Sequence, residues 1–324
     1  MVRLLSLGLR LIVLLLALVA CAPPPLAQSV RSADIAELWQ EPTDLVQRDL
    51  FWGPGGASVA PREDVAFEFV DFKTSGTNPG YDVRDPSGRS WSVKLGVEAQ
   101  SEVTASRILW ALGYHQPATY YLPQFTLTGA ESGTKVQARF RTELEPWRPA
   151  GEWSWYANPF ADTQPFRGLI VAQLLLNSWD LKTSNNRIYE SADAGMRPPR
   201  RFVVRDMGAS LGHSKQFYLF NLLGTRGLQG SKSDVAGFEE QGFITRVDGD
   251  RVEFDYRGMN DALLDVVTVA DVVWLCERFN RIPDGHLKAA FRAGGYSVED
   301  TDRYIRKLRE KIAQGLALGT HTTR

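Results

Sequence analysis

The sequence predicts an α+β protein with two lobes, a small β-rich lobe followed by a larger α-helical lobe. Alternating and β-branched residues, separated by turns that contain Gly, Pro and Asn, dominate residues 64–150. Helical periodicity dominates residues 151–324. A connector rich in Pro and Trp, EPWRPAGEWSWYANPF, lies where one pattern gives way to the other. The 324 residues, 44% of them hydrophobic, suffice to bury a core in each lobe.

The first residues are typical of an export signal and not of a folded element. Arg3 and Arg10 accompany an apolar run at residues 11–20, which is too short to span a bilayer comfortably. We therefore expect residues 1–20 to be a signal peptide that is removed, and the chain to be exported.

The end of this segment resembles the bacterial lipobox, because small and aliphatic residues, LVA, lead to Cys21. That resemblance implies cleavage before Cys21 and lipid attachment to it, so that the chain is held at the membrane. Ala22 then favours the periplasmic face of the outer membrane over retention in the inner membrane. An ordinary signal peptide cut near residues 23–28 is the alternative.

Composition excludes several classes of protein. The net charge is −1 and no segment is strongly basic, which argues against a nucleic-acid partner. Two cysteines and four scattered histidines exclude a disulfide scaffold and argue against a Cys/His zinc cluster. With Cys21 in the lipid anchor, we expect Cys276 to be a buried thiol without a partner.

Each element of the first lobe follows from a local pattern. Residues 21–63 form a tether with a short helical stretch. After this tether, alternation of apolar and polar residues, interrupted by the turns TSGTNPG and DPSG, predicts strands. Gly113 is expected to end a helix. The predicted strands are residues 65–73, 81–85, 89–95, 118–129 and 134–144, and the predicted helix is residues 101–114.

The second lobe is predicted to be mostly helical. A long apolar helix at residues 163–179 precedes a short hairpin, formed by residues 186–190 and 200–206. The further helices are predicted at residues 214–223, 260–267, 268–280, 283–295 and 298–317.

Two polar motifs follow the apolar helix and the hairpin. Asp180, Lys182 and Asn185 have the spacing Asp-Leu-Lys-x-x-Asn, and Asp206-Met207-Gly208 begins 21 residues after Asn185, at the end of a predicted strand. These motifs resemble the catalytic loop and the Asp-Phe-Gly element of the protein-kinase-like superfamily.

The resemblance implies a protein-kinase-like fold and a phosphotransferase that uses ATP and magnesium. Asn185 and Asp206 would hold Mg²⁺ through oxygen atoms, which are the ligands that this ion prefers. Asp180 would accept the proton of the acceptor hydroxyl, and Lys182 would contact the transferred phosphate. Asn186 is an alternative to Asn185.

The same resemblance requires a lysine in the first lobe, paired with a glutamate on the next helix. Lys94 lies on the strand face opposite Trp91, Val93 and Leu95. Glu102 lies on an otherwise apolar stripe of the predicted helix, where a carboxylate requires a cationic partner, and Glu98 is the alternative. This arrangement is most similar to the atypical branch that includes HipA-type and phosphatidylinositol-kinase-like enzymes.

The chain also departs from that superfamily. It has no Gly-x-Gly-x-x-Gly loop; Gly76 and Gly80 in SGTNPG occupy the corresponding turn, and their backbone N–H groups would approach the phosphates. Ser178-Trp179 stands in place of His-Arg before Asp180. The acceptor is left open among a protein hydroxyl, a lipid headgroup, a sugar and an envelope polymer.

Two other hypotheses compete with the phosphotransferase. Ser210 lies in a Gly-x-Ser-x-Gly pentapeptide, and Asp265 or Asp271 with His286 would complete the chain order of an esterase triad. That fold, however, requires strand–helix alternation before the serine, which the first lobe does not offer. The other hypothesis is a catalytically inactive kinase-fold lipoprotein that binds envelope components, since ATP is expected to be scarce outside the cytoplasm.

Overall fold

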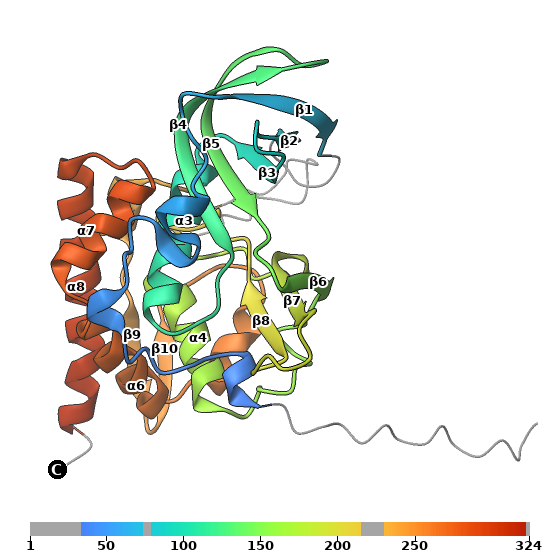
Figure 1. Cartoon of the computed structure of the whole chain (residues 1–324). Coiled ribbons are helices and arrows are strands. Elements are labelled where there is room, and N and C mark those ends of the chain that lie inside the picture. The colour runs from blue at the N-terminus through green and yellow to red at the C-terminus, as the bar shows by residue number, and fades with distance from the viewer. Residues whose placement is uncertain (1–33, 74–78, 215–229, 322–324) are drawn as a thin grey trace, which may run out of the picture. The chain divides into compact units, whose positions relative to one another are not determined.

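The structure is a computed structural model that describes residues 34–73, 79–214 and 230–321. Residues from Asp34 onwards belong to one unit. The proposed lipid site at Cys21, Gly76 and most of the helix expected at residues 214–223 lie outside the described residues. The strands and helices confirm the α+β class, with a β-rich part that precedes a helical part (Figure 1).

The β-rich part is a closed barrel of five strands. The strands are β1 (Ala66–Phe72), β2 (Gly80–Arg84), β3 (Ser90–Leu95), β4 (Ala118–Thr128) and β5 (Gly133–Thr142). Their order is β1-β2-β3-β5-β4, and the parallel pairing of β1 with β4 closes the barrel. The other neighbours are antiparallel. All five were predicted from the sequence, with ends within two residues of those observed.

Alternation along these strands fills the barrel with aromatic side chains. Phe67, Trp91, Phe125 and Phe140 are fully buried and contact one another through tilted or edge-on ring pairs. Because successive side chains of a strand point to opposite faces, burial of Trp91 and its alternate neighbours directs Lys94 out of the barrel. The strand face was therefore predicted correctly.

Helix α3 (Glu98–Ala111) follows β3 and packs against β4 and β5 (Figure 1). It begins three residues earlier than predicted, so that Glu98 lies in its first turn. Gly113 ends it as expected: its φ is +98°, and a Cβ there would lie 2.2 Å from the carbonyl oxygen of Gln40. The chain leaving the helix is thus fixed against the N-terminal segment.

The segments before the barrel differ from the predicted helical stretch. They consist of short 3-10 turns, η1 (Ile35–Glu37), η2 (Leu45–Gln47) and η3 (Gly53–Gly55), and of one turn of helix, α2 (Gly56–Val59). Pro42 and Pro54 interrupt the helical periodicity. Glu37 nevertheless fastens this segment to the helical part through an ion pair of 2.9 Å with Arg200.

A three-stranded sheet connects the barrel to the helices. The connector contains β6 (Trp147–Gly151), which the sequence did not predict, and β6 pairs with β7 (Asn186–Ser191). The predicted hairpin of β7 with β8 (Arg200–Val204) is confirmed. Between β6 and β7 lies the apolar helix α4 (Gln164–Leu175), which begins at the N-cap Thr163.

Helix α4 ends four residues earlier than predicted because the backbone changes direction at Asn177. This residue has a φ of +51°, and its Nδ2 donates to the carbonyl oxygen of Gly212 at 2.7 Å. Asparagine tolerates this left-handed conformation better than most residues. The chain therefore leaves the helix towards the loop at residues 178–185.

The remainder of the helical part surrounds α4. It comprises α5 (Val235–Glu240), β9 (Ile244–Asp248), β10 (Arg251–Phe254), η6 (Asp261–Val266), α6 (Val269–Asn280), α7 (Asp284–Ala293) and α8 (Val298–His321). Helices α6, α7 and α8 were predicted; α5 and the β9–β10 hairpin were not, and residues 261–266 form a 3-10 helix. Cys276 is buried and free, as expected. Within the described ranges, no helix is both apolar and long enough to cross a bilayer.

The barrel core predicts a large difference between two positions of β5. Phe140→Ala, at a fully buried position, is expected to lower the free energy of unfolding by about 3–5 kcal/mol, because it removes apolar contacts and leaves a cavity. Val136→Ala, on the same strand but 58% exposed, is expected to change it by less than about 0.5 kcal/mol. Urea unfolding monitored by tryptophan fluorescence measures both, and equal effects would contradict the barrel packing.

Candidate active site

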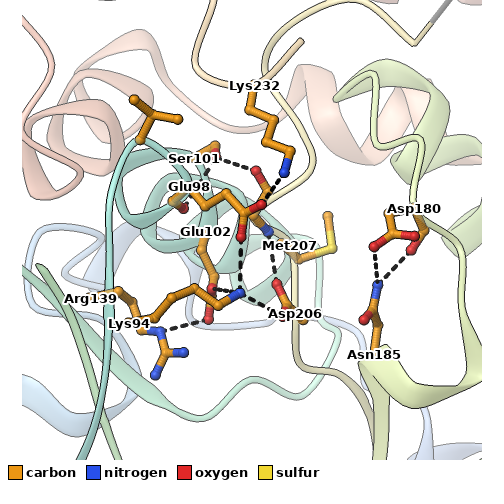
Figure 2. Close-up of polar contacts among 12 residues, drawn as sticks. Lys94, Glu98, Ser101, Glu102, Arg139, Asp180, Asn185, Asp206, Met207 and Lys232 are labelled. Atoms are coloured by element: carbon orange, nitrogen blue, oxygen red, sulfur yellow. Dashed lines mark hydrogen bonds and ion pairs between the residues drawn. The ribbon is translucent and has the colours of Figure 1, made fainter. Parts of the chain in front are cut away.

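Lys94 is the centre of a group of carboxylates that come from distant parts of the chain. Its Nζ lies 2.7 Å from Asp206 Oδ2, 3.1 Å from Glu102 Oε2 and 3.2 Å from Glu98 Oε2 (Figure 2). Strand β3 supplies the lysine, the first two turns of α3 supply both glutamates, and the segment after β8 supplies Asp206. One ammonium group thus contacts carboxylates from both parts of the chain.

Glu102 is the most enclosed of the three acids. It is 1% exposed, and its Oε1 lies 2.9 Å from both Arg139 Nε and Arg141 Nη2. Since Oε2 faces Lys94, three cations surround this carboxylate. A buried charge is stable only when it is paired, and Glu102 meets that condition.

Glu98 joins a different cation to the same group. Its Oε2 contacts Lys94, and its Oε1 contacts Nζ of Lys232, which also lies over the ring of Trp179. The choice between Glu98 and Glu102 that the sequence left open therefore has no single answer, because both carboxylates lie within ion-pair distance of Lys94.

Asp206 is held by the turn that follows it. The backbone N of Gly208 donates to its Oδ1 at 3.2 Å, and Ser101 of α3 donates to the carbonyl oxygen of Gly208 at 2.7 Å. A Cβ at Gly208 would lie 2.9 Å from the Cβ of Glu98, so a larger residue would push this turn away from α3. The Asp-Met-Gly sequence thus sets the distance between Asp206 and the glutamates.

The charges of this group shift two pKa values in opposite directions. Burial alone lowers the pKa of Lys94, but Glu102 and Asp206 more than offset it, and the pKa is raised above its ordinary value. For Asp206, burial raises the pKa and Lys94 lowers it more strongly, so the pKa lies well below its usual range. Both groups are therefore charged at neutral pH.

The loop with the Asp-Leu-Lys-x-x-Asn spacing lies beside Asp206. The carbonyl oxygen of Asn185 accepts hydrogen bonds from the backbone N of Arg205 at 2.8 Å and of Asp206 at 3.2 Å. Asn185 Nδ2 donates to the carbonyl oxygen of Asp180 at 2.6 Å, and Lys182 Nζ lies 2.8 Å from Asp180 Oδ1. Figure 2 shows Asp180 and Asn185 facing each other across the loop.

Asn186, the alternative to Asn185, is turned away from this loop. It is fully buried, and its Nδ2 donates to the carbonyl oxygen of Trp153 at 3.0 Å. It therefore joins the start of β7 to the connector and does not face Asp180. Of the two asparagines, Asn185 is the one placed to contact a ligand.

These residues line one cleft with a cavity of about 340 Å³. Its lining includes Gly80, Lys94, Glu98, Asp180, Lys182, Asn185 and Asp206. A Cβ at Gly80 would lie 2.7 Å from the carbonyl oxygen of Val93, which accounts for glycine at that position. Of the residues chosen first for the kinase-like site, the cleft thus contains all that the structure describes except Glu102, which contacts Lys94.

The donor set fits a magnesium ion that is held jointly with phosphates. Among the described residues, no cluster of three or more Asp, Glu, His or Cys side chains has the geometry of a metal site. Asp206 and Asn185 offer two oxygen ligands, and Mg²⁺ commonly takes one or two protein ligands together with substrate phosphates and water. In this structure Lys94 contacts Asp206 Oδ2, so a metal ion that took this oxygen would displace the lysine.

Four arginines and two lysines of the cleft were not among the predicted site residues, namely Arg139, Arg141, Arg187, Arg205, Lys73 and Lys232. Arg139 and Arg141 alternate with the buried Ala138 and Phe140, so the period of two along β5 could have placed them on the same side as Lys94. Lys232 follows a stretch that the structure does not describe, and its sequence carries no comparable signal.

The proposed esterase residues do not form a triad. Ser210 is fully buried, and its Oγ donates to the carbonyl oxygen of Met207 at 2.6 Å. Asp271 accepts from Arg167 and Thr268, Asp265 pairs with Arg251, and His286 faces the carbonyl oxygen of Val46. Since each group has another partner and the serine is inaccessible, the esterase hypothesis is wrong for these residues.

No protein-family model and no curated protein matches the chain. Several solved kinase structures are similar to it. A Helicobacter pylori proinflammatory kinase, CtkA, is 12% identical with a TM-score of 0.45, over 78% of this chain and 97% of that chain. The Golgi casein kinase with Mn/ADP bound is 10% identical with a TM-score of 0.40, over 90% and 87% of the two chains. The Rio2 kinase–ADP/Mg²⁺–phosphoaspartate complex from Chaetomium thermophilum is 15% identical with a TM-score of 0.34, over 78% and 73%.

The enclosure of Glu102 predicts that its charge is needed for folding. Glu102→Gln is expected to lower the free energy of unfolding by about 3–5 kcal/mol, because three cations lose their buried counter-charge. Glu253→Gln removes a carboxylate whose ion pair with Arg246 is exposed, and little change is expected. Chemical denaturation of both variants measures this difference; equal stabilities would show that Glu102 is not required to balance the cluster.

Proposed function

We propose that the chain is a kinase-like phosphotransferase that uses ATP and magnesium in the cleft around Lys94. One observation carries the proposal: a lysine paired with buried glutamates contacts Asp206, and Asp206 is joined by backbone hydrogen bonds to the loop of Asp180 and Asn185. Phosphoryl transfer needs these three functions in one place, namely cations for the phosphates, oxygen ligands for a metal ion and a carboxylate for the acceptor hydroxyl.

Asp180 is the base in this proposal. Its carboxylate lines the cleft, and the contacts from Lys182 and Asn185 fix its orientation. The acceptor hydroxyl would donate to this carboxylate, which takes the proton as the oxygen attacks phosphorus. Lys182 lies beside it with a largely exposed side chain and would contact the transferred phosphate.

Asn185 and Asp206 would hold the metal ion. When bound, magnesium neutralises negative charge on the phosphates and orients them. Lys94 would then exchange its contact with Asp206 for the phosphate oxygens, while Glu102 and Glu98 keep the ammonium group in place. Gly80 stands close to these groups, and we propose that its backbone, together with Gly76, approaches the phosphates.

Export and membrane attachment through Cys21 belong to the same proposal, and the leader and the lipobox-like sequence support them. The acceptor would then be a hydroxyl of the cell envelope, on a protein, a lipid headgroup or a sugar.

A non-catalytic binding role is the alternative. The direct contact of 2.7 Å between Lys94 and Asp206 favours it, because a lysine that stays bound to this carboxylate would compete with a metal ion. The following two tests separate the alternatives.

Binding of ATP with magnesium is expected to depend on Asp206. At an ATP concentration of 100 times Kd with excess Mg²⁺, the free energy of unfolding of the full-length chain is expected to rise by about 2.7 kcal/mol. Asp206→Asn should abolish the part of this stabilisation that requires Mg²⁺, whereas Asp265→Asn, at an exposed position outside the cleft, should keep it. Thermal unfolding with and without Mg²⁺ measures the effect. If ATP stabilises the native chain equally with and without Mg²⁺, binding does not depend on the metal ion and this prediction is wrong.

Asp180 is expected to act on turnover and not on binding. Asp180→Asn should change the Kd for ATP with Mg²⁺ by less than about twofold. It should lower the rate of phosphate release from ATP by about 10²-fold or more, because the base is lost. Measurement of Kd by calorimetry and of phosphate release in parallel separates the two. A native chain that binds ATP with Mg²⁺ but releases no more phosphate than Asp180→Asn would be a binding protein.

A further inference from the structure

The cleft is unusually cationic for a site that would bind a nucleoside. Of the described residues that line it, eight are Lys or Arg and four are Asp or Glu. Among the same described lining residues, only Trp179 and Ala209 have apolar side chains. Pockets for organic ligands are mostly lined by apolar and aromatic side chains, with a few polar groups. This cleft has the opposite composition.

Two of these cations project from β5 towards the inner end of the cleft. Arg139 and Arg141 are only 2% and 5% exposed, and both depend on the single carboxylate of Glu102, which Lys94 also contacts. Arg139 additionally donates to the carbonyl oxygen of Ser92 at 2.8 Å. Arg141 Nε is buried without a hydrogen bond to any described residue. Both guanidinium groups thus line the cleft next to one shared carboxylate, and one N–H of Arg141 is left for a ligand.

Two more arginines approach from the other wall. Arg205 directly precedes Asp206, and Arg187 lies near the start of β7, where it pairs with Glu152. Arg205 is partly buried and lies close enough to Arg141 and Arg187 to be repelled by their positive charges. Burial, followed by Arg141, lowers the pKa of Arg139 to about 10, whereas Glu102 offsets the burial of Arg141 and raises its pKa. Four guanidinium groups therefore crowd one end of the cleft.

Such an arrangement favours an anion that enters it. Like charges in a partly buried site repel each other and lose hydration, and an anionic ligand relieves both effects. Guanidinium groups bind phosphate through two parallel hydrogen bonds, which makes arginine well suited to that ligand. An uncharged base would instead displace hydration from the arginines without offering them a counter-charge.

We propose that the arginine end of the cleft, formed by Arg139, Arg141, Arg187 and Arg205, binds phosphate groups in place of a nucleobase, so that the phosphoryl donor is an inorganic polyphosphate. The inference rests on the proposed function, because Asp180, Asn185 and Asp206 keep the roles given above. It changes the donor from a nucleotide to a phosphate chain.

The transfer step balances without a nucleoside. The acceptor hydroxyl oxygen attacks the terminal phosphorus, and its proton passes to the carboxylate of Asp180. The bond between that phosphorus and the bridging oxygen breaks, and the bridging oxygen keeps the electron pair. The products are a phosphate ester of the acceptor and a chain shorter by one phosphate, whose negative charge stays with the arginines.

Calorimetry on the full-length chain with excess Mg²⁺ tests the proposal with tripolyphosphate, ATP and adenosine as probes. Tripolyphosphate is expected to bind at least tenfold more tightly than ATP, and adenosine is expected not to bind. Arg187→Gln and the double variant Arg187→Gln/Arg205→Gln are expected to weaken tripolyphosphate about tenfold or more, because charge-assisted contacts are lost. Arg246→Gln, on the exposed hairpin β9–β10, removes the same charge elsewhere and should leave the affinity unchanged.

The outcomes separate this inference from the proposed function. The inference is wrong if ATP binds as tightly as tripolyphosphate or more tightly. It is also wrong if Arg187→Gln and the double variant unfold thermally like the native chain and keep the native affinity for tripolyphosphate, because the arginine end then does not bind phosphate. The phosphotransferase proposal stands in that case, provided that binding still requires Mg²⁺ and Asp206. Binding of neither ATP nor tripolyphosphate in the presence of Mg²⁺ would overturn both.

Discussion

The carboxylate of Glu102 is the interaction on which the site depends. It lies on α3 and contacts Lys94 of β3 together with Arg139 and Arg141 of β5. Glu102, Arg139 and Arg141 are almost fully buried, so removal of the carboxylate would leave two buried guanidinium groups without the partner that they share. The carboxylate therefore fixes the angle between helix and barrel as well as the position of Lys94. Lys94 in turn contacts Asp206, whose backbone is hydrogen-bonded to the loop that contains Asp180.

Lys94 links this internal arrangement to the ligand site. Three carboxylates surround it, which is more than one ammonium group needs, and only Asp206 belongs to the helical part of the chain. The lysine can therefore give up Asp206 to a metal ion or a phosphate while Glu98 and Glu102 still balance its charge. The contact between Lys94 and Asp206 is thus the one that a ligand would replace, while Ser101 of α3 still contacts the carbonyl oxygen of Gly208.

The sequence predicted most of this arrangement because its signals are local. The period of two along β3 placed Lys94 outside the barrel, and the spacing from Asp180 to Asn185 predicted a loop that the structure closes with a hydrogen bond between these residues. The missing elements depend on contacts that no local pattern encodes. Strand β6 contains Pro149 and pairs at a sheet edge, where β-propensity is a weak guide, and the β9–β10 hairpin is short and mostly exposed. Arg139 and Arg141 were detectable by periodicity, but their shared partner Glu102 is 37 and 39 residues away, and only the folded barrel brings them together.

Two sets of groups in the cleft would bind anions, namely the metal ligands Asp206 and Asn185 and the arginine end. Asp206 and Asn185 need a metal ion before they attract phosphate, since a carboxylate alone repels it. The arginine end needs no metal ion, because its guanidinium groups are charged at every physiological pH. A ligand that reaches from Asp206 to the arginine end is therefore expected to be negatively charged along its whole length. It needs a metal ion only where it meets Asp206 and Asn185. For the export that we propose, this division has a further consequence. Nucleotides are expected to be scarce there, and a site that recognises phosphate by charge and not by a base does not depend on them.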